Sequence, residues 1–238
     1  MPHVNLYFLP VLLLLIAVMV FCMRARKLTI TAGIAALFLG ALVYLAARER
    51  GLILLFTFFI LSVLATAHGK RRKAGTDSVA RHPEGRDVWQ VLANGGMSGL
   101  LAVAILIDPL HQSLYLLMMA ASLAAALSDT LSSELGTVYG RGFYHILNFR
   151  KDFKGLDGVV SIEGTLIGAI AAGLMGLIYG GWSRLSMYVA VAGILGNLMD
   201  SVLGAAFERR QYIGNNTVNF LNTLFAALVA LCGMLFLS

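Results

Sequence analysis

The chain has 238 residues, of which 59% are hydrophobic and only 13% are charged, and its mean hydropathy is +0.82. Soluble domains carry about 25% charged residues, so this composition excludes an ordinary soluble enzyme and indicates an integral membrane protein. The net charge of +6 comes from basic loops between apolar segments, which can contact anionic lipid head groups, and it does not indicate a nucleic-acid partner.

Apolar segments recur along the whole chain at a length suited to membrane-spanning helices, which need roughly 20 residues. Eight such segments lie at residues 4–23, 28–47, 51–67, 89–107, 113–135, 158–180, 184–207 and 216–237. The sequence therefore predicts an all-α, polytopic membrane protein with about eight transmembrane helices. We expect one integral membrane domain, with an N-terminal three-helix part (1–67), a basic loop (68–88) and a five-helix catalytic part (89–238).

The basic residues are unevenly distributed between the connections. Fifteen of the 18 Lys and Arg residues fall in the odd-numbered connections, and the other three are Arg48, Arg50 and Arg184. Basic loops mark the cytoplasmic side of a membrane protein. The pattern thus predicts that both termini lie outside and that the odd-numbered connections face the cytoplasm.

Polar side chains gather at the predicted cytoplasmic ends of five spans. Charged residues inside a span are costly and are functional candidates by default. The candidates are Asn94, Gly95, Asp129, Thr130, Ser133, Glu134, Asp157, Ser161, Thr165, Asp200, Ser201, Asn216 and Asn219. Helical spacing gives several of them a shared face, as with Asp129 and Ser133, which are one turn apart. One polar pocket, open to the cytoplasm, is the economical interpretation.

Such a pocket has the donor atoms of a metal and phosphate site. Carboxylates from Asp129, Glu134 and Asp200, with hydroxyl and amide oxygens around them, suit Mg²⁺ or Mn²⁺. Gly-rich helix starts at 94–96 and 155–158 would offer backbone N–H groups to an anion. Arg150 and Lys154 could neutralise phosphate charge. Together these features suggest phosphoryl or nucleotidyl transfer onto a lipid head group.

Some of these polar residues could instead have a purely structural role. Asp129 and Asp200 could each pair with an Arg, and Asn219 could bridge helices by hydrogen bonds. There is also a hint of a parallel helix-pair repeat, because Asp129-Thr130 near the end of one span parallels Asp200-Ser201 near the end of another.

Four sequence blocks carry a resemblance to a known family. They are Gly85–Gly96, Ser128–Gly136, Gly158–Thr165, and Asp200–Ala205 with Asn215–Asn219. In this order they resemble a family of integral membrane proteins that includes the chloroplast phytyl-phosphate kinases and many uncharacterised bacterial and archaeal members. Relatives usually have Ala and Trp where this chain has Ser128 and Leu131.

The resemblance implies a lipid kinase that transfers phosphate from a nucleoside triphosphate, CTP above all, to an isoprenyl monophosphate such as phytyl or geranylgeranyl phosphate. On this hypothesis Asp129, Glu134 and Asp200 hold Mg²⁺ (or Mn²⁺), and the remaining candidates bind phosphate oxygens or metal-bound water. Two alternatives stay open. A CTP-dependent lipid-phosphate cytidylyltransferase would use the same groups, whereas a lipid or ion transporter would need polar residues through to the other face.

Overall fold

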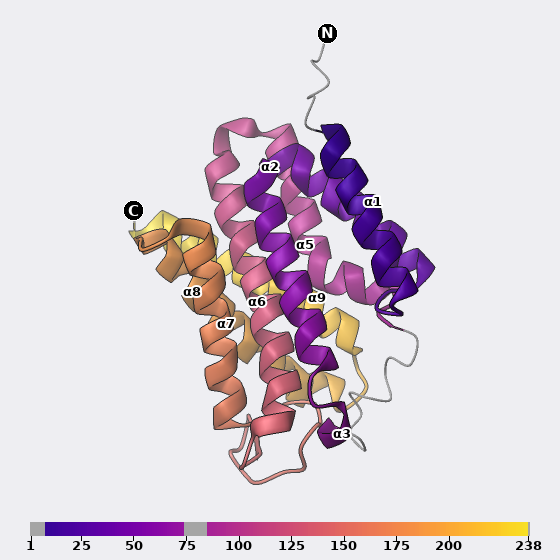
Figure 1. Ribbon diagram of the computed structural model, residues 1–238. Coiled ribbons are helices and arrows are strands. Elements are labelled where there is room, and N and C mark those ends of the chain that lie inside the picture. Colours follow the sequence, from indigo (N-terminus) through magenta and orange to yellow (C-terminus); the bar gives the residue numbers. More distant parts are fainter. Residues whose placement is uncertain (1–7, 74–84, 238) are drawn as a thin grey trace.

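The computed structural model describes residues 8–73 and 85–237 (Figure 1). Its elements are α1 (Phe8–Arg24), α2 (Ile30–Ala67), α3 (Lys70–Lys73), α5 (Val88–Ile107), η1 (Pro109–His111), α6 (Gln112–Tyr139), β1 (Tyr144–His145), β2 (Val159–Val160), α7 (Ile162–Gly180), α8 (Arg184–Leu203), η2 (Gly204–Glu208) and α9 (Asn215–Leu237). Within the described residues six helices are long and apolar enough to cross a membrane, and α1 is a shorter apolar helix. The all-α membrane class is therefore confirmed. Residues 4–7 of the first predicted span, and 74–84 of the predicted basic loop, lie outside the described residues.

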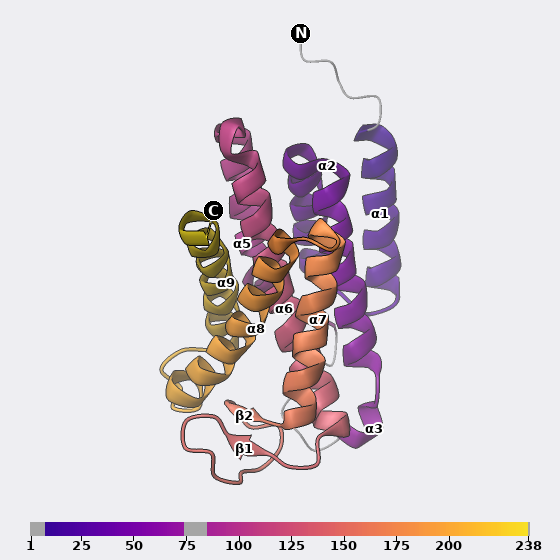
Figure 2. The same ribbon diagram turned by 90° about the vertical axis from the view of Figure 1, so that its left-hand side faces the viewer.

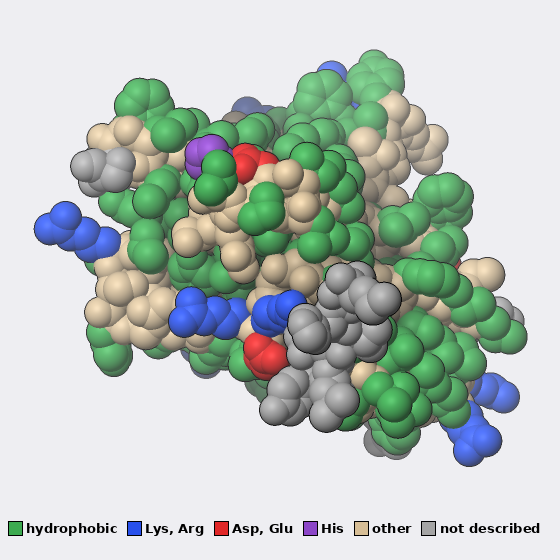
Figure 3. All heavy atoms as spheres, turned by 90° about the horizontal axis from the view of Figure 1, so that it is seen from above, with side chains coloured by type: hydrophobic (Ala, Val, Ile, Leu, Met, Phe, Trp, Pro, Cys, Tyr) green, Lys and Arg blue, Asp and Glu red, His purple; other side chains and the backbone are tan. Residues whose placement is uncertain are grey.

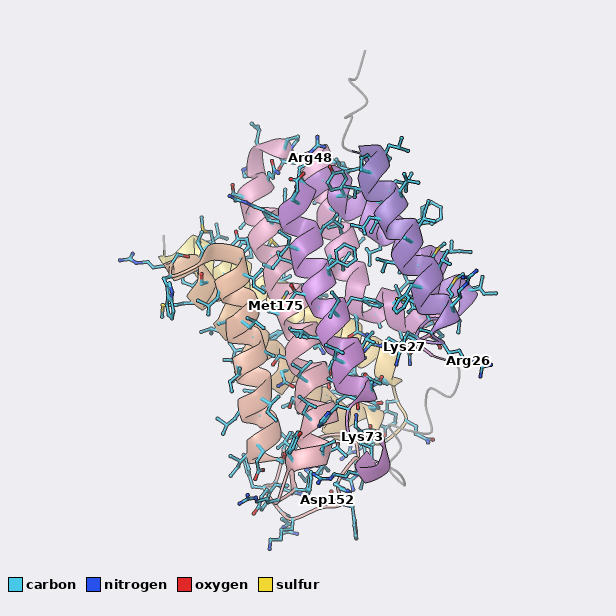
Figure 4. All side chains as sticks on the ribbon, viewed as in Figure 1. Arg26, Lys27, Arg48, Lys73, Asp152 and Met175 are labelled. Carbon is cyan, nitrogen blue, oxygen red and sulfur yellow. The ribbon has the colours of Figure 1, made fainter. Side chains whose placement is uncertain are left out.

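The helix α2 contains two of the predicted spans. Its 38 residues are interrupted at Arg48, whose backbone angles (φ 53°, ψ −147°) are not helical. Tyr44 and Leu52, on either side of this break, pack in one cluster with Leu15 of α1. Figure 4 shows Arg48 at one end of the bundle and both Lys27 and Lys73 lower down, so the chain turns back at Arg48. Residues 28–47 and 51–67 thus form two arms, as the sequence predicts.

The helix α6 is the centre of the bundle. Every residue from Leu116 to Ser128 is buried, and α6 packs against α2, α5, α7, α8 and α9. A helix that is apolar on all sides suits the interior of a helix bundle. Small side chains let helices approach closely in a membrane, so the alanines of this segment allow five helices to pack around α6.

Small residues fix where α8 crosses α6. A Cβ added to Gly193 would lie 2.9 Å from the Ala124 Cβ, and one added to Gly196 would lie 2.5 Å from the Ala125 Cβ. Asp129 follows Ala125 by one helical turn, and Asp200 follows Gly196 by one turn. The crossing therefore brings the two aspartates to the same level of the bundle.

A short β-hairpin lies at the end of the bundle towards which α6 and α8 run (Figure 2). Its strands are antiparallel, with Tyr144 opposite Val160 and His145 opposite Val159. The helix α7 begins only after this hairpin, where Ser161 caps it by accepting a hydrogen bond from Gly164 N at 3.1 Å. The predicted helix start at residues 155–158 is wrong, because Gly155 and Gly158 have positive φ and this segment turns into β2.

Gly158 holds the hairpin against the end of α8. Its φ is +72°, and a Cβ there would lie 2.5 Å from both the N and Cα atoms of Ala205 in the π-helical turn η2. We expect Gly158→Ala to lower the unfolding midpoint temperature and to displace the hairpin, because both the backbone conformation and the contact oppose a side chain.

Gly181→Ala is the matched control for this prediction. Gly181 has φ +59° with open space around the added Cβ, so its substitution carries only the conformational penalty, on the order of 1–3 kcal/mol. Thermal unfolding in detergent compares the two variants. An equal effect of both substitutions would show that the contact with Ala205 contributes nothing.

The two ends of the bundle differ in chemistry. Seen from the end opposite the β-hairpin, the surface consists mainly of hydrophobic side chains together with uncharged polar side chains and backbone, and charged side chains form small separate groups (Figure 3). The polar side chains that line one cavity do so together with residues of the β-hairpin segment. In the ribbon views α1 begins and α9 ends away from the hairpin (Figures 1 and 2). Which end faces the cytoplasm stays a prediction, as does the helix-pair repeat.

Candidate functional site

A polar cavity of about 210 Å³ opens at the β-hairpin end of the bundle. It is walled by the end of α2, the segment before α5, α5, α6, α8, α9, η2 and the segment that leads from the hairpin into α7. Ten of the fifteen predicted site residues line it: Asn94, Asp129, Thr130, Ser133, Glu134, Asp157, Ser161, Asp200, Ser201 and Asn219. The structure thus brings residues from four separate sequence blocks around one space.

Asp129 and Asp200 form the centre of the cavity. Their carboxyl groups lie within hydrogen-bonding reach of each other. Ser133 Oγ donates to Asp129 Oδ1 at 3.5 Å, and Asn222 Nδ2 donates to Asp200 Oδ1 at 2.7 Å. Two adjacent carboxylates repel each other, so the pair requires a shared proton or a cation between them. A structural pairing of either aspartate with an Arg is absent from the ion pairs among the described residues.

The helix α9 contributes amide groups to the same space. Asn219 Nδ2 donates to Asn215 Oδ1 at 3.3 Å, whereas Asn219 Oδ1 is buried without a hydrogen-bond partner in the described structure. Asn222, fully buried, orients Asp200 as described above. A buried amide oxygen in the same cavity as two carboxyl groups is an acceptor that a cation or a hydroxyl group would satisfy.

The third predicted carboxylate has a different partner. Glu134 Oε2 lies 2.6 Å from Lys73 Nζ, and the Lys73 side chain is only 2% exposed. Lys73 also donates to the Ala65 and Thr66 carbonyl oxygens, at 3.0 and 3.2 Å. Glu134 therefore anchors the end of α2 and α3 to α6. Among the described residues no three His, Cys, Asp or Glu side chains cluster as a metal centre, so the predicted three-carboxylate set is not formed here.

The cavity contains a cation that the sequence did not single out. Among the described residues that line it, Arg86 is the only basic one. Arg86 N donates to Lys27 O at 3.0 Å and Arg86 O accepts from Thr29 N at 3.1 Å, so its backbone is paired with the α1–α2 connection. Burial lowers the pKa of the Arg86 guanidinium, and the Glu134 carboxylate opposes that shift. The group stays charged, because arginine is not deprotonated in proteins.

Gly95 does not line the cavity, although the sequence predicted an anion-binding helix start there. The helix α5 begins earlier, at Val88, with a capping box in which Gln90 N donates to Asp87 Oδ1 at 2.9 Å and Asp87 N to Gln90 Oε1 at 3.1 Å. Gly95 instead faces α2, where an added Cβ would lie 2.5 Å from Leu39 Cδ2. The Asp-x-x-Gln spacing was the signal for the true start.

Four other predicted residues lie off the cavity. Arg150 and Lys154 are exposed in the hairpin loop, and Lys154 Nζ donates to Arg72 O at 3.2 Å. Thr165 Oγ1 donates to the Ser161 carbonyl oxygen at 3.0 Å. Asn216 lies beside Asn215, which does line the cavity. The positive charge near the carboxylates therefore comes from Arg86 and Lys73.

The hairpin loop is tied to the end of α8 by an ion pair. Arg209 Nη1 donates to Asp152 Oδ2 at 2.6 Å, and this hydrogen bond lowers the pKa of the Asp152 carboxyl group. Together with Gly158 against Ala205, this contact holds the loop over the carboxylate side of the cavity.

The donor set fits a hard divalent cation. Asp129, Asp200 and the unpartnered Asn219 Oδ1 are all oxygen donors at the cavity. Mg²⁺ usually takes only one or two protein carboxylates and completes its shell with water and substrate phosphates. A pair of aspartates is therefore sufficient protein ligation for this ion.

Comparisons with known proteins agree with the membrane architecture. An uncharacterized membrane protein of Methanocaldococcus jannaschii is 36% identical over 183 residues, covering 75% of this chain and 74% of the relative. Another from Synechocystis is 29% identical over 200 residues, covering 81% and 77%. Protein VTE6, chloroplastic, of Arabidopsis thaliana is 30% identical over 211 residues, covering 84% and 63%. No solved structure matches the chain.

One family model matches nearly the full length of the chain. It is that of the integral membrane protein family DUF92, and it aligns with residues 13–227. The match includes all four sequence blocks and every residue of the cavity wall named above. The chain therefore belongs to the DUF92 family of integral membrane proteins.

Proposed function

We propose that this protein is a Mg²⁺-dependent lipid kinase that transfers a phosphate from a nucleoside triphosphate, CTP by preference, to an isoprenyl monophosphate. The observation that carries the proposal is the adjacency of Asp129 and Asp200 in a polar cavity with Arg86 on its wall. Carboxylates, a guanidinium and hydroxyl groups are the parts with which proteins bind metal-bound phosphates. The resemblance to the family that includes the phytyl-phosphate kinases supplies the class of substrate.

Phosphoryl transfer requires the protein mainly to position the two substrates and to neutralise the charge of their phosphates. An oxygen of the lipid monophosphate attacks the γ-phosphorus of the nucleotide, a new P–O bond forms, and the bond to the β-phosphate bridging oxygen breaks. The attacking oxygen is already ionised, so no general base is needed. A bound Mg²⁺ would neutralise phosphate charge during the transfer. Asp129 and Asp200 would hold that ion, Asn219 Oδ1 would bind the ion or its water, and Ser161 would orient a phosphate oxygen.

The arrangement of polar groups argues against a transporter. A translocation path needs polar side chains through to the opposite face. The buried segment of α6 between Leu116 and Leu127 has Ser122 as its only polar side chain.

A product assay tests the proposal directly. Purified protein is incubated with CTP or ATP, Mg²⁺ and geranylgeranyl monophosphate, and the lipid products are identified by mass spectrometry, with EDTA and nucleotide-free controls. We expect the prenyl diphosphate together with the nucleoside diphosphate. A CDP-lipid and pyrophosphate would identify a cytidylyltransferase instead, and no consumption of either nucleotide would contradict both activities.

A further inference from the structure

A second, apolar cavity adjoins the polar one. It has a volume of about 80 Å³ and lies between α1, both arms of α2 and the start of α5. Its walls include Val18 of α1, Leu37 and Phe56 of the two α2 arms, and Val91 of α5. All of its lining residues are apolar except three.

Those three polar residues also line the polar cavity. Arg86, Gln90 and Asn94 are shared by both lining sets. Among the described residues, every polar side chain that lines the apolar cavity therefore lies where the two cavities meet. A site with a charged junction and a hydrocarbon-lined extension matches a ligand with an anionic head and an apolar chain.

The junction is rigidly built. Residues 85–86 pair with the α1–α2 connection through the two backbone hydrogen bonds of Arg86. Gly85, with φ +95°, permits this, because a Cβ there would lie 2.7 Å from the Lys27 carbonyl carbon. Gln90 is fixed by the capping box, and Asn94 Nδ2 donates to Gln90 O at 3.0 Å. The backbone of Arg86 is thereby fixed where the cavities join, and the residue lines both of them.

Resting on the proposed function, we propose that the apolar cavity between α1 and α2 binds the first part of the isoprenyl chain, with Arg86 binding the lipid phosphate at the junction. The guanidinium can form two parallel hydrogen bonds to a phosphate. The chain would enter sideways from the bilayer past α1, which packs mainly on α2 at one edge of the bundle (Figure 1). The nucleotide would then occupy the part of the polar cavity nearer Asp129, Asp200 and the hairpin.

Photolabelling tests the chain position without turnover. Full-length protein in nanodiscs is irradiated with a prenyl monophosphate that carries a diazirine on its second isoprene unit, in the absence of nucleotide, and labelled peptides are mapped by mass spectrometry. We expect labels in α1 and in residues 52–59 of α2, reduced by Val18→Trp and, more mildly, by Ala36→Leu. Gly173→Trp, in an open groove between α7 and α8, is the control and should change nothing. Labels mainly on α7 or α8, or labelling unaffected by both cavity variants, would overturn the inference.

Kinetics separate this inference from the kinase proposal. Val18→Trp should raise KM for geranylgeranyl phosphate about tenfold, as expected when roughly two buried CH₂ groups lose their contacts, and should leave KM for dimethylallyl phosphate unchanged. Arg86→Gln should weaken binding of the lipid phosphate but not of the corresponding alcohol. Turnover with labels elsewhere would contradict only the chain site, whereas specific labels without turnover of any nucleotide would contradict only the kinase.

Discussion

Replacing either central aspartate with asparagine is expected to abolish turnover while the protein remains folded. Both Asp129→Asn and Asp200→Asn remove a negative charge without changing the shape of the side chain. Loss of even an outer-shell partner of a metal site lowers activity or affinity about 10–100-fold, so we expect a loss of at least about 100-fold for a direct ligand. Product formation at saturating lipid and nucleotide measures this effect.

Metal-dependent stability provides a second measurement for the same variants. Mg²⁺ or Mn²⁺ should raise the unfolding temperature of the parent protein, because a ligand that binds only the folded state stabilises it. Neither Asn variant should show this rise. Without metal, both should be at least as stable as the parent, since the repulsion between adjacent carboxylates is gone.

Asp108→Asn is the matched control. Asp108 follows α5 outside the cavity, where its carboxylate accepts from Tyr115 Oη at 3.0 Å and lies 2.7 Å from His111 Nδ1. This variant should keep full turnover and the full metal response. Normal activity in Asp129→Asn or in Asp200→Asn would remove that residue from the catalytic site.

The second large effect is expected at the buried ion pair between Lys73 and Glu134. Lys73→Met should lower the free energy of unfolding by about 3 kcal/mol, because it leaves a carboxylate unpaired in a poorly solvated site. It also removes the donor to the Ala65 and Thr66 carbonyl oxygens. Unfolding of the detergent-solubilised protein by SDS titration measures the loss.

A double-mutant cycle isolates the pair from its surroundings. Lys73→Met combined with Glu134→Gln should cost less than the sum of the single substitutions, because the double variant removes both charges of this ion pair. Lys154→Met serves as the control, since Lys154 is exposed and, within residues 8–73 and 85–237, its ammonium bonds only to the Arg72 carbonyl oxygen. Additive effects in the cycle, or equal losses in Lys73→Met and Lys154→Met, would show that the pair is not a stabilising contact.

The lengths of the apolar segments were enough to predict the spans, and the direction of each span was enough to predict that Asp129 and Asp200 lie at the same end of the bundle. Both aspartates lie in long apolar segments, and the direction of each segment follows from counting spans. The turn at Arg48 inside α2 also matches the predicted gap between residues 47 and 51. These features depend on local sequence and on chain direction alone.

The basic side chains of the site were not predictable in the same way. Lys73 and Arg86 lie in a basic segment that sequence alone identifies only as a topology signal. Their positions depend on contacts between distant parts of the chain, such as the pairing of Leu28 with Arg86. Arg150 and Lys154 are likewise one arginine and one lysine, but both are exposed and neither lines the cavity. Charge alone therefore could not tell the two pairs apart.

The crossing of α6 and α8 has a consequence for how this site can be tuned. Gly196 and Ala125 touch one helical turn from the two carboxyl groups, so these small apolar residues act as a spacer that sets the gap between the acids. Metal coordination tolerates changes in ligand distance of only about 0.2 Å. A single methyl group added at Gly196 would exceed that tolerance, because stiff helices transmit the displacement along their length. On the proposed function, the ion preference of the site would depend on the small apolar residues at this helix crossing as well as on the oxygen atoms that would bind the ion.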